Sequence, residues 1–271
     1  MNAVDAATAR AAIARRRLWY HTIELAPGVV TPGWFDLRGI VDRLPWPDVR
    51  GKRCLDVGPY DGFLSFELER RGAAEVIAAD IASAADWDWP ARMRALGPAA
   101  LAEQAGPDPG GGFEIAREAL SSSARRVEVS VYDLSEATVG SFDVVVCGSL
   151  LLHLRDPVRA LEAIRGVCRE AFLSAETIDP LLTLVSPRRP GTRFRGGERM
   201  QWLIPNRAAH AAMLAAAGFE LDRVTRPYAI PLGPGHPATR TSAATLRREA
   251  ATILLTGRRG VPHVAALARP G

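Results

Sequence analysis

Short apolar runs recur along the chain, and polar or glycine-rich segments separate them. Apolar runs without polar alternation are typical of strands that are buried on both faces of a parallel sheet. The segments between them carry apolar residues at helical spacing, so strand and helix are expected to alternate. We predict an α/β fold with a seven-stranded, mostly parallel sheet and helices on both of its faces. The predicted strands cover residues 54–57, 76–79, 127–131, 142–147, 171–178, 219–230 and 251–258.

Capping residues mark the ends of several predicted helices. Asp156 and Pro157 are suited to the N-cap and first position of a helix over residues 158–168. Asn206 is suited to cap a later helix, and Gly218 is suited to end it. Further helical segments are predicted at residues 2–18, 63–71, 113–120 and just before Leu44 and Pro45.

Two segments lack the periodicity of helices and strands. Residues 97–112 are rich in glycine, proline and alanine, which predicts a flexible linker. Residues 186–199 carry five arginines and are predicted to form a loop, either an anion-binding rim or a solvated basic segment. We divide the whole chain into an N-terminal helical and aromatic extension or lid, residues 1–50, and a main α/β domain, residues 51–271.

Composition limits the classes to which the protein can belong. With 48% hydrophobic residues among 271, the chain has enough apolar material for a core. Its longest uncharged apolar stretch, residues 144–154, is too short to span a bilayer. The net charge of +4 comes almost entirely from arginine, without the dense basic patch of nucleic-acid-binding proteins. We therefore expect no membrane anchor and regard nucleic acid as the less favoured partner.

The cysteines and the N-terminus indicate a reducing compartment. Cys54, Cys147 and Cys168 are scattered and stand in apolar surroundings, so they are predicted to be reduced core thiols. Their spacing fits neither a metal site nor a disulfide framework, and we predict no bound metal. The first residues carry Asp5 and three consecutive arginines without the apolar stretch of a secretory signal, so we expect a cytoplasmic protein.

Residues 53–80, RCLDVGPYDGFLSFELERRGAAEVIAAD, carry the clearest chemical signal. A strand runs into a turn with Gly58 and Gly62, a helix follows, and a second strand ends on Asp80. The glycines allow the backbone to approach a ligand, and the start of the helix offers free N–H groups. A carboxylate at the end of the second strand can accept hydrogen bonds from both ribose hydroxyls. The segment therefore predicts a nucleotide site.

Tyr60 distinguishes between two kinds of nucleotide. A dinucleotide-binding turn has glycine at this position, because a side chain there crowds a pyrophosphate. The pattern D-V-G-P-Y-D-G-F instead resembles the D-x-G-x-x-x-G motif of class I S-adenosylmethionine (SAM) methyltransferases. In that family a carboxylate beside the turn, here Asp56, suits the ammonium group of the cofactor. The resemblance implies a Rossmann-like fold and SAM as cofactor, with NAD as the less favoured alternative.

The same resemblance implies a set of cofactor contacts. It makes Gly58, Gly62, Asp80 and Asp133 contacts of SAM, with Asp133 accepting from the adenine amino group or, alternatively, capping a turn. Trp87 follows the second strand and is a candidate for the adenine pocket or for surface packing. The complete predicted set is Asp56, Gly58, Pro59, Tyr60, Asp61, Gly62, Asp80, Ile81, Trp87, Asp133, Leu134, Gly148 and Ser149.

The fourth predicted strand leads into a second candidate region. Residues 148–155 follow its carboxyl end, where open α/β sheets place their sites, and His153 is among them. We predict that His153 faces Tyr20 and His21 across the transferred methyl group, with one histidine as general base. The alternatives are a structural histidine and, for the aromatic-rich residues 19–36, a satellite hydrophobic cluster. The residues predicted to contact the acceptor are Trp34, Arg155 and Trp202.

A closer resemblance rests on short phrases spread over residues 18–230. WYHTIEL, VTPGWFD, DVGPYDGF, DWDWP, VYDL, CGSLLLHLRDP and WLIPN, in this order, are similar to the DUF1698 (Methyltransf_9) group. That group includes a tRNA wobble-uridine carboxymethyltransferase, which uses carboxy-SAM and has a tyrosine before the crossover histidine. Here Leu152 takes that position. We therefore expect methylation of a small molecule, such as a secondary metabolite, with ordinary SAM; the alternatives are a tRNA-modifying enzyme and a non-catalytic SAM-binding protein.

Overall fold

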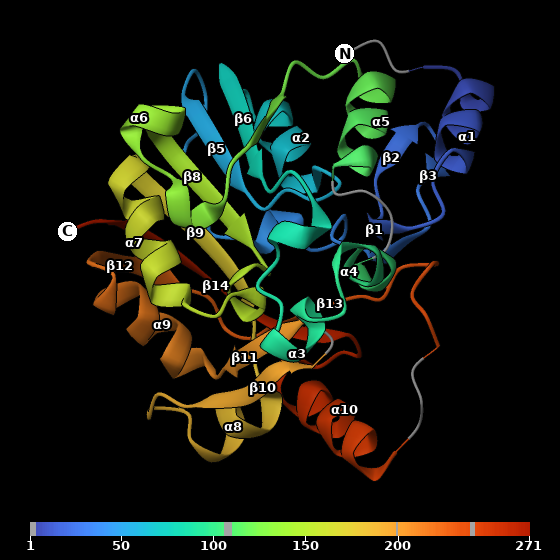
Figure 1. The fold of residues 1–271 in the computed structure, drawn as a ribbon. Helices are drawn as coiled ribbons and strands as arrows, with labels where there is room; N and C mark the ends of the chain where they lie inside the picture. Colours follow the sequence, from blue (N-terminus) through green and yellow to red (C-terminus); the bar gives the residue numbers. More distant parts are fainter. Residues whose placement is uncertain (1–3, 106–109, 199, 239–241) are drawn as a thin grey trace.

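The computed structural model describes residues 4–105, 110–198, 200–238 and 242–271 (Figure 1). Its central sheet has eight strands, seven of them in the order β12-β14-β9-β8-β5-β6-β7, and β13 pairs with β14. Strands β5 to β9 are parallel, whereas β14 runs antiparallel between β9 and β12. The bounds are β5 (Arg53–Val57), β6 (Glu75–Asp80), β7 (Arg125–Glu128), β8 (Phe142–Gly148), β9 (Cys168–Thr177), β12 (Phe219–Val224), β13 (Tyr228–Ile230) and β14 (Val261–Pro270).

Helices cover both faces of this sheet, as the alternation of strand and helix predicts (Figure 1). In β8, Val144 and Val146 pack into one apolar cluster, whereas Val145 and Cys147 pack into the other. This period of two follows from the pleat, because successive side chains point to opposite faces. The first cluster includes side chains of α1 (Ala6–Ala14), α2 (Phe63–Arg70) and α5 (Gly111–Leu120); the second includes those of α7 (Pro157–Val167) and α9 (Arg207–Ala216).

The N-terminal segment packs on the first of these faces. Trp19 and Leu25 are fully buried and belong to the same cluster as α2 and α5. The segment forms two small ladders, one parallel and one antiparallel, and a 3₁₀ turn. Its elements are β1 (Trp19–His21), β2 (Glu24–Ala26), β3 (Val29–Val30), β4 (Gly33–Phe35) and η1 (Val41–Arg43). The segment and the sheet therefore share one core.

The remaining elements lie around the ends of the strands. They are η2 (Ala84–Asp86), α3 (Ala91–Arg94), α4 (Pro98–Ala105), η3 (Val131–Asp133), α6 (Glu136–Val139), η4 (Leu151–His153), α8 (Pro180–Val185), β10 (Thr192–Glu198), β11 (Gln201–Pro205) and α10 (Ala243–Thr256). The predicted caps are confirmed, since Asp156 accepts from the Arg159 N–H and Asn206 accepts from the Ala209 N–H. The three cysteines are buried and free, as predicted.

The prediction of the last two strands is wrong. Residues 251–256 form the end of α10, which Ser242 caps and the left-handed Gly257 ends, and the final strand is β14. A short apolar run does not by itself distinguish a buried strand from a helix. The predicted strand 219–230 is two strands, β12 and β13, so the sheet has eight strands and not seven.

Both segments predicted to be irregular contain regular structure. In residues 97–112, the alanine-rich part forms α4 and the last two residues begin α5, because alanine, leucine and glutamate favour a helix despite the flanking glycines and prolines. Residues 106–109 lie outside the described residues. In residues 186–199, strand β10 pairs with β11 as an exposed hairpin, which needs no apolar periodicity; Arg199 lies outside the described residues.

Two smaller boundaries also differ from the prediction. The described part of the predicted helix 2–18 is helical only over Ala6–Ala14, because Asp5 caps its start; residues 2 and 3 lie outside the described residues. The predicted strand 127–131 ends at Glu128, because Ser130 caps a 3₁₀ turn.

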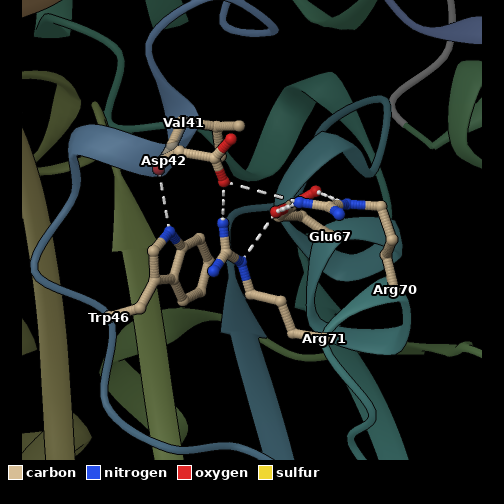
Figure 2. Close-up of polar contacts among 6 residues, drawn as sticks. All are labelled: Val41, Asp42, Trp46, Glu67, Arg70 and Arg71. Carbon is tan, nitrogen blue, oxygen red and sulfur yellow. Dashed lines mark hydrogen bonds and ion pairs between the residues drawn. The ribbon is translucent and has the colours of Figure 1, made fainter.

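An ion-pair network ties η1 to the end of α2 (Figure 2). Arg71 donates to Glu67 at 2.7 Å and to Asp42 at 2.5 Å, and its guanidinium lies 4.5 Å from the centre of the Trp46 ring. Arg70 also pairs with Glu67, but its side chain is 59% exposed, whereas that of Arg71 is 22% exposed. The network connects the segment before residue 50 to the helix that follows the glycine turn.

We expect Arg71→Leu to lower the free energy of unfolding by about 1–2 kcal/mol, because it removes a half-buried charge network and a stacked contact. Arg70→Leu is the matched control, and its effect should stay within about 0.5 kcal/mol, as for most exposed ion pairs. Urea unfolding of both variants measures the difference. Arg70 also lies within 3.5 Å of Asp42, so equal losses of stability would show that the Trp46 contact and the closer approach of Arg71 to Asp42 contribute nothing.

Candidate functional site

The turn after β5 has the backbone that the glycine pattern predicts. Gly58, Tyr60 and Gly62 have φ angles of +71°, +51° and +89°, in the left-handed region. A Cβ atom at Gly62 would lie 2.6 Å from the Phe113 side chain, so only glycine fits this position without displacement of α5. Tyr60 holds a conformation that is uncommon for a residue with a side chain, and its N–H donates to Asp80 at 3.2 Å.

Asp80 connects the turn to the end of β6. Its carboxylate accepts from the backbone N–H groups of Tyr60 and Ile81, and burial raises the pKa of the group. Beside it, a pocket lies at the carboxyl ends of β6 and β7. This pocket is lined by Ile81, Ala82, Asp86, Glu128, Val129, Ser130 and Asp133. The predicted positions Ile81 and Asp133 are therefore brought together next to Asp80, in the arrangement expected for a ribose and a base.

Trp87 and Leu134, which are also predicted to contact the cofactor, lie outside this pocket. Trp87 does not line this pocket; its ring stacks on Trp89, with centroids 5.9 Å apart, in a small apolar cluster. Trp87 therefore packs on another side chain, which is the alternative to a place in the adenine pocket. Leu134 is buried in the core cluster that includes α7, so it supports the pocket from behind. Sequence spacing alone does not distinguish Trp87 or Leu134 from residues that line the pocket.

Asp56 and Asp61 are both buried but have different partners. Asp56 accepts from the Ser65 hydroxyl at 2.7 Å and lines a second cavity, and burial raises its pKa to about 7. Asp61 accepts from the N–H groups of Tyr20 and His21, at 2.5 and 3.1 Å, and burial raises its pKa to about 6. Its other oxygen lies 3.8 Å from the Arg16 guanidinium. Asp61 therefore anchors β1 to the turn, and its contact with the cofactor stays a prediction.

The second cavity lies where the N-terminal segment covers the carboxyl ends of β5, β8 and β9. Most of its wall is aliphatic or aromatic, and its polar residues are few. The lining residues are Tyr20, His21, Phe35, Leu37, Ile40, Leu44, Asp56, Gly58, Pro59, Leu64, Gly148, Ser149, Ala175, Thr177, Tyr228, Ile230, Val261 and His263. The predicted residues Tyr20 and His21 thus meet Gly58, Pro59, Gly148 and Ser149 around one cavity. Trp34 is not among them; it lies 6.3 Å from the Tyr20 ring.

Two buried polar atoms of this wall have no hydrogen-bond partner among the described residues. They are Nδ1 of His21 and the hydroxyl of Tyr228. Burial lowers the pKa of His21 to about 3 and raises the pKa of Tyr228. Buried polar atoms are nearly always paired in folded proteins, since an unpaired one costs about 1–3 kcal/mol. Unpaired atoms in a cavity wall are therefore suited to bind a polar ligand.

His263 is a site residue that the sequence did not reveal. Its Nε2 lies 2.8 Å from the Ser149 hydroxyl and 3.0 Å from that of Thr177, and all three residues line the cavity. It was missed because the final strand was predicted at residues 251–258. The apolar run of β14 around His263, which follows the glycine-containing turn at residues 257–260, is the signal that could have placed it.

The predicted meeting of His153 with Tyr20 and His21 is wrong. His153 does not line the cavity; its Nδ1 lies 2.8 Å from the carbonyl oxygen of Met200, beside β11. The crossover turns this side chain toward the hairpin, because η4 packs on β11. His153 is therefore a structural histidine, which is the alternative to a catalytic role, and it is not a candidate for the general base.

Arg155 and Trp202 lie together, but outside both cavities. The Arg155 guanidinium lies 5.0 Å from the centre of the Trp202 ring, and the indole N–H donates to the carbonyl of Asp88 at 2.6 Å. The Asp88 carboxylate accepts from the Arg155 N–H and the Tyr132 hydroxyl. These contacts fasten the hairpin to the segment after β6, and the acceptor contacts of Arg155 and Trp202 stay a prediction.

Glu176, near the end of β9, is a buried acid that the sequence did not single out. Its two oxygens accept from the N–H groups of Leu151 and Thr177, each at 2.8 Å. Burial raises its pKa to about 8, despite these hydrogen bonds. It holds η4 against the sheet directly behind the cavity.

Within the described ranges, no three histidine, cysteine or acidic side chains gather in a way that would hold a metal ion. In the same parts of the chain, no helix combines the length and apolar character needed to cross a bilayer.

Comparison with known proteins identifies similar chains. A family model described as a methyltransferase domain matches residues 55–171. The ubiquinone biosynthesis O-methyltransferase of Paracidovorax citrulli is 30% identical over 206 residues, which are 69% of this chain and 76% of that protein. The protein of the same name from Neisseria meningitidis serogroup C is 34% identical over 120 residues, 43% of this chain and 39% of that one. The chain spans only 39–44% of the length of the first curated relatives it matches.

Among solved structures, the N-terminal domain of EvdMO1 with SAH bound is similar over nearly the whole chain. The TM-score is 0.56 at 15% sequence identity, covering 99% of this chain and 98% of that domain. This likeness shows the fold, which is the Rossmann-like class I methyltransferase fold with a mostly parallel central sheet.

The raised pKa of Glu176 makes the free energy of unfolding depend on pH. Between pH 4.5, its ordinary pKa, and about 8, the folded protein binds more protons at this group than the unfolded chain does. The group's contribution to the free energy of unfolding therefore falls as pH rises through this range. We expect Glu176→Gln to gain stability relative to the wild type from pH 4.5 to pH 8, as measured by urea unfolding at fixed pH. The exposed Glu162→Gln is the control; parallel pH curves for Glu176→Gln and the wild type would contradict the prediction.

Proposed function

The chain belongs to the family of SAM-dependent methyltransferases, and we propose that it transfers a methyl group from SAM to a hydroxyl of a small aromatic acceptor. The observation that carries this proposal is the cavity that begins at Gly58 and Pro59 of the cofactor turn and continues under the N-terminal segment. Its wall is mostly apolar, and unpaired polar atoms interrupt it. Oxygen as the acceptor atom is supported by the names of the related O-methyltransferases.

The residues around the turn fit the cofactor. Asp56 is 1% exposed, and its side-chain hydrogen bond to Ser65 supplies no positive charge. A buried carboxylate without a cation is unfavourable, so an ammonium group beside it would be stabilising. Asp80 and Asp133 offer oxygens to a ribose and to an adenine amino group. When bound, SAM supplies a methyl group activated by its sulfonium.

The chain's own contribution is then alignment and the exclusion of water. Tyr20, Phe35 and Ile40 close the cavity above the sheet, and an apolar wall of this kind fits an aromatic ring. His21 and Tyr228 can hydrogen-bond the polar groups of the acceptor. Holding two reactants in line can supply several kcal/mol of a reaction barrier. We propose that residues 1–50 act as the acceptor wall, since they provide six of the residues that line the cavity, Tyr20, His21, Phe35, Leu37, Ile40 and Leu44.

We propose that the resemblance to the DUF1698 group reflects common ancestry. We propose no preference for carboxy-SAM, because Leu152 is 3% exposed and carries no hydroxyl for an additional carboxylate. A tRNA acceptor fits the enclosed cavity less well than a free small molecule does.

Incubation with methyl-labelled SAM and small phenols and catechols tests the proposed activity. We expect transfer of label to at least one hydroxylated aromatic compound, and no transfer to the corresponding compound without hydroxyls. Tight SAM binding without transfer to any of them would contradict the proposal and favour a SAM-binding protein or another acceptor class. Transfer to tRNA alone would favour the tRNA-modifying alternative.

Asp80→Ala should weaken the binding of SAM and S-adenosylhomocysteine. Loss of a charged acceptor for hydroxyl groups costs on the order of 1.5–3 kcal/mol, or about 10–150-fold in Kd. Titration calorimetry measures the change. Asp222→Ala is the control, because Asp222 lies on β12 and pairs with Arg269. Unchanged SAM affinity in Asp80→Ala would remove Asp80 from the cofactor site.

A further inference from the structure

We infer that His263 is the general base that takes the proton of the acceptor hydroxyl, an inference that rests on the proposed methyl transfer. His263 lies on β14, is 3% exposed, and lines the same cavity as His21 and the turn residues Gly58 and Pro59. Nothing in the local sequence indicates a catalytic residue, since His263 stands in an apolar strand. Its hydrogen bonds assign it this role.

The first of these bonds fixes which ring nitrogen carries the proton. Nδ1 of His263 lies 2.9 Å from the carbonyl oxygen of Val261. A carbonyl oxygen only accepts, so Nδ1 must be the protonated nitrogen of the neutral ring. Nε2 is then left with a free electron pair. Burial lowers the pKa of His263 to about 4, so the ring is neutral at neutral pH and its Nε2 is a hydrogen-bond acceptor.

The second pair of bonds shows how an acceptor could reach Nε2. The hydroxyls of Ser149 and Thr177 lie 2.8 and 3.0 Å from this atom, and both must donate to it. A single lone pair cannot accept both hydrogens well, so one of the two is replaceable by the hydroxyl of an acceptor. Both residues line the cavity, and so this exchange needs no movement of the sheet.

The surroundings hold the ring in place. The Tyr228 ring stacks on it with centroids 6.0 Å apart and an angle of 26° between the planes. In the sheet, His263 is paired with Thr177 of β9 on one side and with Tyr228 of β13 on the other. Ser149 has a φ of +52°, a left-handed conformation that is strained in a residue with a side chain, and it places the serine beside His263.

The other histidines are less suited to the role. His21 lines the cavity, but no hydrogen bond from a described residue to its Nδ1 fixes its tautomer. His153 and His210 do not line the cavity; His210 is buried beside Ser174, 2.9 Å from its hydroxyl. His210 is thus a matched buried histidine outside the site.

The step balances in protons and electrons. The O–H bond of the acceptor breaks, with its proton going to Nε2, and an O–C bond forms to the methyl carbon. The S–C bond to that carbon breaks, and its electron pair stays on sulfur. The imidazolium then returns its proton to water when the cavity opens.

Nitrogen-15 NMR of histidine-labelled protein tests the tautomer without any acceptor. We expect the His263 signals of the Nδ1-protonated form at pH 7, and we expect the Nε2 shift to move in Ser149→Ala. Assignment comes from the signals lost in His263→Ala. A proton on Nε2 at pH 7 would overturn the inference whatever the activity of the protein.

Turnover with two acceptors tests the base directly. For catechol, His263→Ala should lower kcat by roughly 10²–10⁴, as expected for loss of general base catalysis. For 4-nitrocatechol, whose hydroxyl is far more acidic and ionises without help, the loss should be much smaller. His210→Ala should keep near-normal turnover of both, and calorimetry should show unchanged SAM affinity in each variant.

A merely structural role predicts equal losses on the two acceptors, and that result would overturn the inference, as would full activity of His263→Ala on catechol. Wild-type protein that binds SAM but methylates neither compound would instead contradict the proposed phenol acceptor itself, and the assigned role of His263 with it. The two failures are therefore distinguishable.

Discussion

The buried carboxylate of Asp61 is the interaction on which the candidate site depends. It stands in the glycine turn, yet its oxygens accept from the backbone of β1 and face the Arg16 guanidinium. The turn and the wall of the acceptor cavity are thus positioned by the same group. Since backbone N–H groups must find acceptors when they are buried, β1 can cover the sheet here only because an acid is present beneath it. The fixed position of Tyr20 and His21 follows from that requirement.

A cost in stability accompanies this arrangement. Burial raises the pKa of Asp56, Asp61, Asp80 and Glu176, and the first two lie close enough to Asp80 for like charges to repel. Hydrogen bonds from serine and from backbone N–H groups offset only part of this cost. A cationic ligand bound beside Asp56 would relieve it further, so ligand binding should stabilise the fold by more than its contact area suggests.

The sequence predicts residues that line both pockets, among them Asp133 in one and Tyr20 and His21 in the other, but it does not reveal His263. The turn, Asp80 and Asp133 stand at the carboxyl ends of three neighbouring parallel strands, β5, β6 and β7, and this order along the chain is sufficient to bring them together. His263 and Thr177 meet through the pairing of β14 with β9, which joins residues far apart in the chain. His153 illustrates the reverse case. It stands at the correct edge of the sheet, but its direction depends on the β10–β11 hairpin, whose charged strands carry no apolar pattern.

The position of β14 determines the order in which the strands of the sheet can pair during synthesis. This strand follows every other strand of the sheet along the chain, yet it lies between β9 and β12. During synthesis, β5 to β9 can pair as soon as they emerge, whereas β12 has no place in the sheet until β14 has been made. The edge of β9 therefore stays unpaired through this interval, and its apolar side chains are open to contacts with other nascent chains. The strand that carries His263 is also the one that ends this exposure.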